Sequence, residues 1–117
     1  MANDPRKYLE DMILAAANVT EILGTADLAM YLDSLTIRSG VERQLQIIGE
    51  ALYQLDRRHP SVASRVDSYR VIINFRHVLV HGYDTLNDSA VYSIAVERIP
   101  GLVRELTELL KELGNTP

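Results

Sequence analysis

Apolar residues recur every three or four positions along almost the whole chain, which is the spacing of amphipathic α-helices. The pattern predicts a first helix that begins at Pro5, after Asp4 as its N-cap, and ends before Gly24. A short second helix is expected to begin after Thr25, as its cap, and to run through Ser34. The first quarter of the chain is therefore predicted to be helical, with one break at the glycine.

The clearest periodic stretch lies in the middle of the chain. Its apolar residues are separated by 4, 4, 3, 4 and 3 positions, and they are Ile37, Val41, Leu45, Ile48, Leu52 and Leu55. This spacing predicts a long third helix that ends near Arg58, before His59 and Pro60.

Two further helices are predicted in the second half. Asp67 is expected to cap a fourth helix, and Gly82 is expected to follow its last turn. The last helix is expected to open at Asn87 or Asp88, and Pro100 is expected to kink it. The β-branched run 71–73 could suggest a strand, but no alternating segment exists to pair with it. The prediction is an all-α, antiparallel up-and-down bundle of four to five helices in a single domain, residues 1–117.

Composition limits the class of protein. Hydrophobic residues make up 47% of the 117 residues and charged residues 24%, as in an ordinary globular domain. The absence of cysteine excludes disulfides, thiolate metal sites and a cysteine nucleophile. No signal peptide is recognisable, and no apolar run approaches the roughly 18 residues of a membrane span, so a cytoplasmic protein is expected. A helical protein of this size often buries further apolar surface by self-association.

Charge is distributed unevenly along the chain. The net charge is −4, which alone would argue against a nucleic-acid partner. From residue 57 to residue 83, however, the chain has five arginines and a single acid, Asp67, which gives a local net charge of +4. This segment is a candidate anion site, although a solvated helix surface with surplus arginine would give the same count.

The candidate chemistry gathers at the end of the fourth predicted helix, in Arg76, His77, His81 and Tyr83. Arginine carries a permanent charge and a planar fork that matches phosphate oxygens. Histidine gives and takes protons near neutral pH. Together they suffice for cleavage of RNA by its own 2′-hydroxyl, with neither metal nor other cofactor.

Helix geometry separates these side chains. Arg76 and His81 are five positions apart, which is about 140° around a helix, so they do not share one narrow face. His77 and His81 do share a face, and Arg76 nearly aligns with Tyr83. A cleft lined by two copies of the chain would use this divergence better than one chain alone. Two readings stay open: His77 and His81 as metal ligands, although no third ligand or HExxH glutamate is evident, and all four residues as ordinary surface groups.

The segment resembles the Arg-x4-His-x-Tyr motif of the HepT-like toxins, the DUF86 group of the HEPN superfamily, with Arg76, His81 and Tyr83 in its three places. The resemblance extends to the opening 4–12, to the central segment 41–51 and to Ile99-Pro100, so it covers nearly the whole chain. It departs at His77, where many members have asparagine and the superfamily also tolerates aspartate or histidine.

The resemblance implies a homodimer, or a higher even oligomer, in which two motifs form one composite ribonuclease site with Arg76 and His81 as catalytic residues. It also implies a toxin whose antitoxin is a minimal nucleotidyltransferase that transfers AMP to Tyr83. His77 is expected to support the site, and Glu50, at a recurrent family position, to orient Arg76 or a histidine. The alternative is a non-catalytic binding partner or substrate-binding subunit of a nucleotidyltransferase. A plain dimerisation domain would leave the motif unexplained.

Overall fold

A computed structural model describes residues 4–82 and 86–114. Within these two ranges the chain forms helices and no strand, which confirms the all-α prediction. The elements in chain order are α1 (Pro5–Leu23), α2 (Leu28–Asp33), α3 (Leu35–Arg58), α4 (Pro60–Ala63), α5 (Tyr69–His81), α6 (Asp88–Ser93), the π-helix η1 (Ile94–Arg98) and α7 (Ile99–Gly114).

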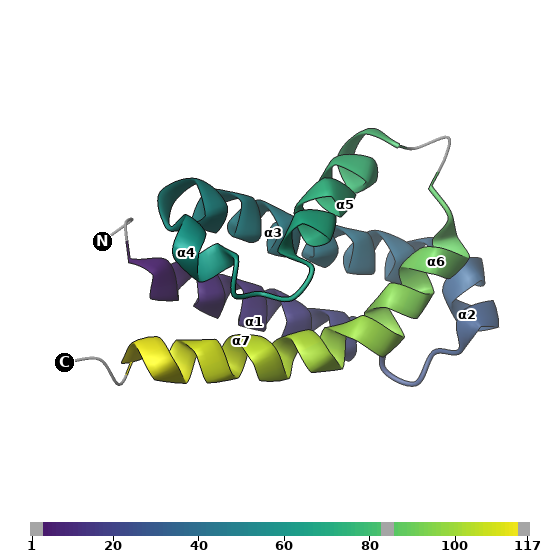
Figure 1. The fold of residues 1–117 in the computed structure, drawn as a ribbon. Coiled ribbons are helices and arrows are strands. Elements are labelled where there is room, and N and C mark those ends of the chain that lie inside the picture. The colour runs from purple at the N-terminus through teal and green to yellow at the C-terminus, as the bar shows by residue number, and fades with distance from the viewer. Residues whose placement is uncertain (1–3, 83–85, 115–117) are drawn as a thin grey trace.

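The helices form a bundle in which the long elements alternate in direction, as predicted (Figure 1). The most extensive contacts between helices are those of α1 with α3, of α3 with α5 and of α1 with α7. Helix α5 lies at an angle across α3, on the side away from α1 (Figure 1). The short helices α2 and α4 lie near opposite ends of α3 (Figure 1).

The core fills the space between α1, α3 and α7. Each helix contributes residues at the three-to-four spacing that the sequence shows, because one face of each is turned inward. Full burial of such side chains stabilises the fold by roughly 1.5–3 kcal/mol apiece. The largest fully buried ones are Tyr31, Leu9, Met12, Leu52, Leu55, Leu106, Val19, Val41, Val66 and Val91.

The predicted start and end of α1 are confirmed. The Asp4 carboxylate accepts a hydrogen bond from the Arg6 N–H at 3.0 Å, and Gly24 follows the helix with a φ of 52°, which favours glycine. The prediction of Thr25 as the next cap is wrong. Asp27 caps α2 instead, since its carboxylate accepts a hydrogen bond from the Met30 N–H.

The prediction of Asp67 as the cap of the fourth helix is also wrong. Ser68 precedes α5, with a left-handed φ of 59° and no side-chain capping bond. The backbone N–H of Asp67 donates to the Glu105 carboxylate of α7 at 2.6 Å, so a residue far along the chain fixes this turn. The short helix α4 before it, which begins at Pro60, was not expected.

Helix α3 ends at Arg58 as predicted, whereas α2 ends at Asp33, one residue before the predicted Ser34, whose hydroxyl caps α3. The N–H of Gly82 donates to the Val78 carbonyl at 2.8 Å and ends α5, although its φ of −103° needs no glycine. Asn87 caps α6. The helix axis changes direction between α6 and α7, as expected, and the π-helix η1 ends at Arg98, two residues before Pro100 (Figure 1). A π-turn accommodates the proline, which cannot donate to the helix and clashes with the carbonyl four residues earlier.

Candidate functional site

Arg76, on the inner side of α5, lies against α3. Its Nη1 donates to the Glu50 carboxylate at 3.0 Å, and its Cζ lies 4.9 Å from the centre of the Tyr53 ring. The Arg76 side chain is 28% exposed and that of Glu50 is 51% exposed, so this ion pair lies at the edge of the protein and is partly screened by water. The guanidinium is therefore held by a carboxylate and an aromatic face on one neighbouring helix.

The close approach of α5 to α3 at this point depends on Gly49. A Cβ atom at Gly49 would lie 2.5 Å from the Cβ of Arg76 and 3.4 Å from its Cα. Real Cβ atoms do not come so close to another helix, so only glycine allows this packing. Gly49 and Tyr53 are one turn apart on α3, so the position without a side chain and the aromatic ring both lie under Arg76.

Arg76 keeps hydrogen-bonding capacity for an anion. A guanidinium has five N–H donors, and Glu50 receives one of them. The Nε atom is buried without a hydrogen-bond partner in the part of the chain that the structure describes. The remaining donors, at the partly exposed end of the side chain, can bind phosphate oxygens without breaking the contact with Glu50.

His77 and His81 lie in the last turns of α5 and are both exposed. Their ring centres are 4.6 Å apart, which confirms that they share one face of the helix. Among the described residues, no hydrogen bond or ring contact joins either histidine to Arg76. Tyr83 lies outside the described residues.

The sequence placed Glu50 near the site but did not reveal Tyr53 or Gly49. A signal was present: Gly49, Tyr53 and Arg57 are spaced four residues apart and share a face of the third predicted helix. This spacing becomes meaningful only in the structure, where α5 crosses this face of α3.

Four of the five arginines of the basic segment lie in three places. Arg65 pairs with Glu112 of α7, and Arg70 lies with its Cζ 5.1 Å from the centre of its neighbouring ring, Tyr69. Arg57 and Arg76 both lie over Tyr53. Two arginines of the basic segment are thus gathered around one tyrosine. In the described part of the chain, no three His, Asp or Glu side chains are grouped as a metal site would require.

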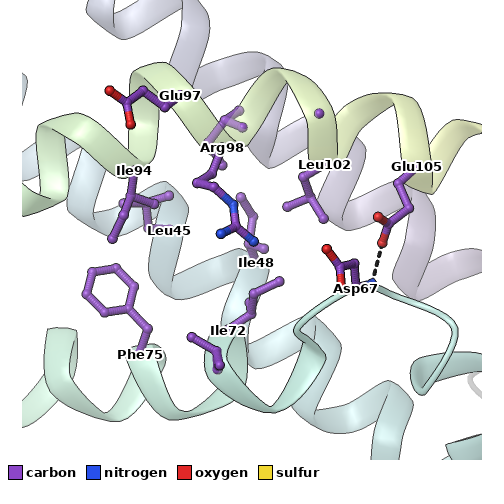
Figure 2. Close-up of a pocket in the computed structure, with 13 residues that line it drawn as sticks. Leu45, Ile48, Asp67, Ile72, Phe75, Ile94, Glu97, Arg98, Leu102 and Glu105 are labelled. Carbon is purple, nitrogen blue, oxygen red and sulfur yellow. Dashed lines mark hydrogen bonds between the residues drawn. The ribbon is translucent and has the colours of Figure 1, made fainter.

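A separate cavity of about 340 Å³ lies between α5, α3 and η1–α7 (Figure 2). Ile72 and Phe75 line it from α5, and the side chain of Arg98 extends into the same region (Figure 2). Arg76, His77 and His81 are not among its lining residues. The cavity is mainly apolar and is distinct from the surroundings of these three side chains.

The fold and site define a class: a small helical bundle with an arginine and two histidines on one helix. The family model described as "Ribonuclease HepT-like" matches residues 12–109, and the chain belongs to this family, as its sequence motifs indicated. No helix within the described residues is long and apolar enough to cross a membrane.

Three relatives share the name "Putative RNase". MJ0127 of Methanocaldococcus jannaschii is 22% identical over 94% of this chain and 90% of its own length. MJ1380 of the same organism is 25% identical, over 88% of this chain and 94% of its own. TTE0752 of Caldanaerobacter subterraneus subsp. tengcongensis is 25% identical, over 92% of this chain and 96% of its own. No solved structure matches the chain significantly.

Proposed function

We propose that this protein is an endoribonuclease that cuts RNA without a metal, at a cleft formed by two copies of the chain. Arg76 stabilises negative charge on the phosphoryl oxygens and His81 transfers protons. The observation that carries the proposal is the placement of the two groups: the Arg76 guanidinium is fixed against α3 by Glu50 and Tyr53, while His81 is exposed at the end of the same helix. Membership of the HepT-like ribonuclease family supports it.

The chemistry needs only what these residues supply. One imidazole removes the proton from the ribose 2′-hydroxyl, whose oxygen attacks the neighbouring phosphorus. Arg76 stabilises the added charge in the transition state. The bond to the 5′-oxygen breaks, and the imidazole that took the first proton gives a proton to that oxygen. The products are a 2′,3′-cyclic phosphate and a 5′-hydroxyl. His77 supports the site by packing against His81.

The second copy would cover the outer face of α5. Val71 is 66% exposed and Val78 is 41% exposed, and their seven-residue spacing puts them on one face of the helix. His81, three positions after Val78, continues that face. Burial of these two valines against a partner would bring the His81 side chains of both copies toward the interface, where each could act beside the other chain's Arg76.

Regulation is the second part of the proposal. Tyr83 follows His81 by two positions and is the motif tyrosine to which a minimal nucleotidyltransferase antitoxin would transfer AMP. The added nucleotide is bulky and anionic, so it would block the cleft and occupy the phosphate-binding arginine. The protein would then be the toxin of a toxin–antitoxin pair. The alternative function is a non-catalytic partner of such a transferase, in which the same surface binds nucleotide without cutting RNA.

Complementation between inactive variants tests the cleft. His81→Ala and Arg76→Ala should each lower RNA cleavage by roughly 10²–10⁴-fold while the far-ultraviolet circular dichroism stays that of the wild type. A mixture of the two variants, refolded together, should regain activity, because a mixed dimer contains one arginine and one histidine from different chains. Undiminished cleavage by His81→Ala overturns the assignment, and inactive mixed dimers overturn the shared cleft. Retained activity in excess EDTA is expected throughout.

A further inference from the structure

A second cation shares the ring that supports Arg76. The Cζ of Arg57 lies 5.8 Å from the centre of the Tyr53 ring, and that of Arg76 lies 4.9 Å from the same centre. Arg57 comes from α3 itself, one turn after the tyrosine, whereas Arg76 comes from α5. A single aromatic side chain is therefore in contact with two guanidinium groups that come from different helices.

The two arginines differ in how they are neutralised. Arg76 has Glu50 as its ion-pair partner. Arg57 takes part in none of the ion pairs found among the described residues, and its side chain is exposed. Arg57 contacts the Tyr53 ring, which attracts a cation without cancelling its charge. Two cations gathered around one ring favour a ligand that carries more than one negative charge.

We propose that Arg57 binds a second phosphate of the RNA, next to the one cut at Arg76, and that Tyr53 is the positioning residue for both arginines. This inference rests on the proposed ribonuclease function and extends it to the substrate. The substrate is then single-stranded RNA with at least two consecutive phosphates at the site. A single strand can follow the exposed surface from α5 onto the last turn of α3, and contacts to its phosphates carry no base preference.

Salt dependence of binding tests the second phosphate directly. The cleavage-deficient His81→Ala protein is titrated with a fluorescent single-stranded decanucleotide at several salt concentrations. Adding Arg57→Ala should lower the slope of log Kd against log salt by about 0.7, which is one phosphate contact on a single strand. Adding Arg57→Lys, which keeps the charge, should retain most of the slope. Arg104→Ala, at an exposed arginine of α7, is the matched control and should leave the slope unchanged.

Substrate length gives a second readout that a merely structural role would not change. Arg57→Ala should raise KM for the decanucleotide by about tenfold, the effect of one charged hydrogen bond. Its effect on a dinucleoside monophosphate, which has one phosphate only, should be clearly smaller. Tyr53→Leu should lower kcat and raise KM for the long substrate, and Tyr53→Phe, which keeps the ring, should restore both.

The outcomes separate this inference from the proposed function. Equal effects of Arg57→Ala on both substrates, or a slope no different from that of the Arg104→Ala control, overturn the second phosphate site. A wild-type protein that binds the decanucleotide with an Arg57-dependent slope but never cuts it overturns the ribonuclease and leaves the binding site. Circular dichroism of each variant checks that the helices are intact.

Discussion

Helices α3 and α5 contact each other extensively yet have opposite characters. Helix α3 has seven buried residues along its 24, and it lies between α1 on one side and α5 on the other. Helix α5 has 13 residues, of which one, Leu79, is buried, and it carries Arg76, His77 and His81. Most of the core therefore lies outside the helix that carries Arg76, His77 and His81. The two helices meet at Arg76, which contacts Glu50 and Tyr53 where α5 passes Gly49.

This division has a physical reason. A proton-transferring histidine and a phosphate-binding arginine must reach water and substrate, so the helix that carries them cannot be buried on all sides. Their positions must nevertheless be fixed, because small displacements in a reacting group have large effects on rate. The bundle of α1, α3 and α7 supplies a fixed surface. The contacts of Arg76 with α3 hold its side chain in position against that surface.

The first test concerns the core side of this comparison. Leu52→Ala, at a fully buried position of α3, should lower the free energy of unfolding by about 2–5 kcal/mol. Leu35→Ala changes the same residue type at the start of the same helix, where the side chain is 70% exposed, and should cost less than about 0.5 kcal/mol. Urea unfolding followed by circular dichroism measures both, and similar losses would contradict the burial that separates them.

The second test is at the seam between the two helices. Gly49→Ala should lower the free energy of unfolding by about 1–2 kcal/mol, because the overpacking penalty exceeds the helix propensity that alanine gains. It should also lower RNA cleavage, since Arg76 must move away from Glu50 and Tyr53. The measurements are urea unfolding and the cleavage rate of the purified variant.

Gly40→Ala is the control for this change on the same helix. A Cβ at Gly40 would lie 3.2 Å from an Ile22 methyl group, and the end of that side chain can shift by a few tenths of an ångström. Its stability should therefore stay within about 1 kcal/mol of the wild type, with unchanged cleavage. Equal changes in the free energy of unfolding and in cleavage for the two alanine variants would show that α5 does not approach α3 closely at Gly49.

The contact between α3 and α5 also separates the features that the sequence predicts from those that it does not. The long helices and several of their boundaries follow from periodicity and from caps such as Asp4 and Asn87, because both signals are local. The turn before α5 does not, since a carboxylate from α7, Glu105, fixes it from 38 positions away. The motif on α5 is likewise visible in the sequence. The parts played by Gly49 and Tyr53 are not, because they depend on which face of α3 the later helix crosses.

The smallest expected effect is inside the core, at Tyr31. Its ring is fully buried beside Tyr92, and its hydroxyl is buried with no hydrogen-bond partner among the described residues. Burial raises the pKa of Tyr31, and the neighbouring carboxylate of Glu42 adds to this, so the neutral phenol is the folded form. Tyr31→Phe removes a buried polar atom and keeps the ring.

Because an unsatisfied buried hydroxyl costs free energy, Tyr31→Phe should raise the free energy of unfolding by about 1 kcal/mol or less. RNA cleavage should not change, since Tyr31 lies on α2 beside Tyr92 of α6 and is not among the residues that hold Arg76. A loss of more than about 1 kcal/mol would mean that the hydroxyl has a water partner that holds it. A loss of cleavage at unchanged stability would mean that the division between core and site is incomplete, with Tyr31 acting on the cleft from the far end of α3.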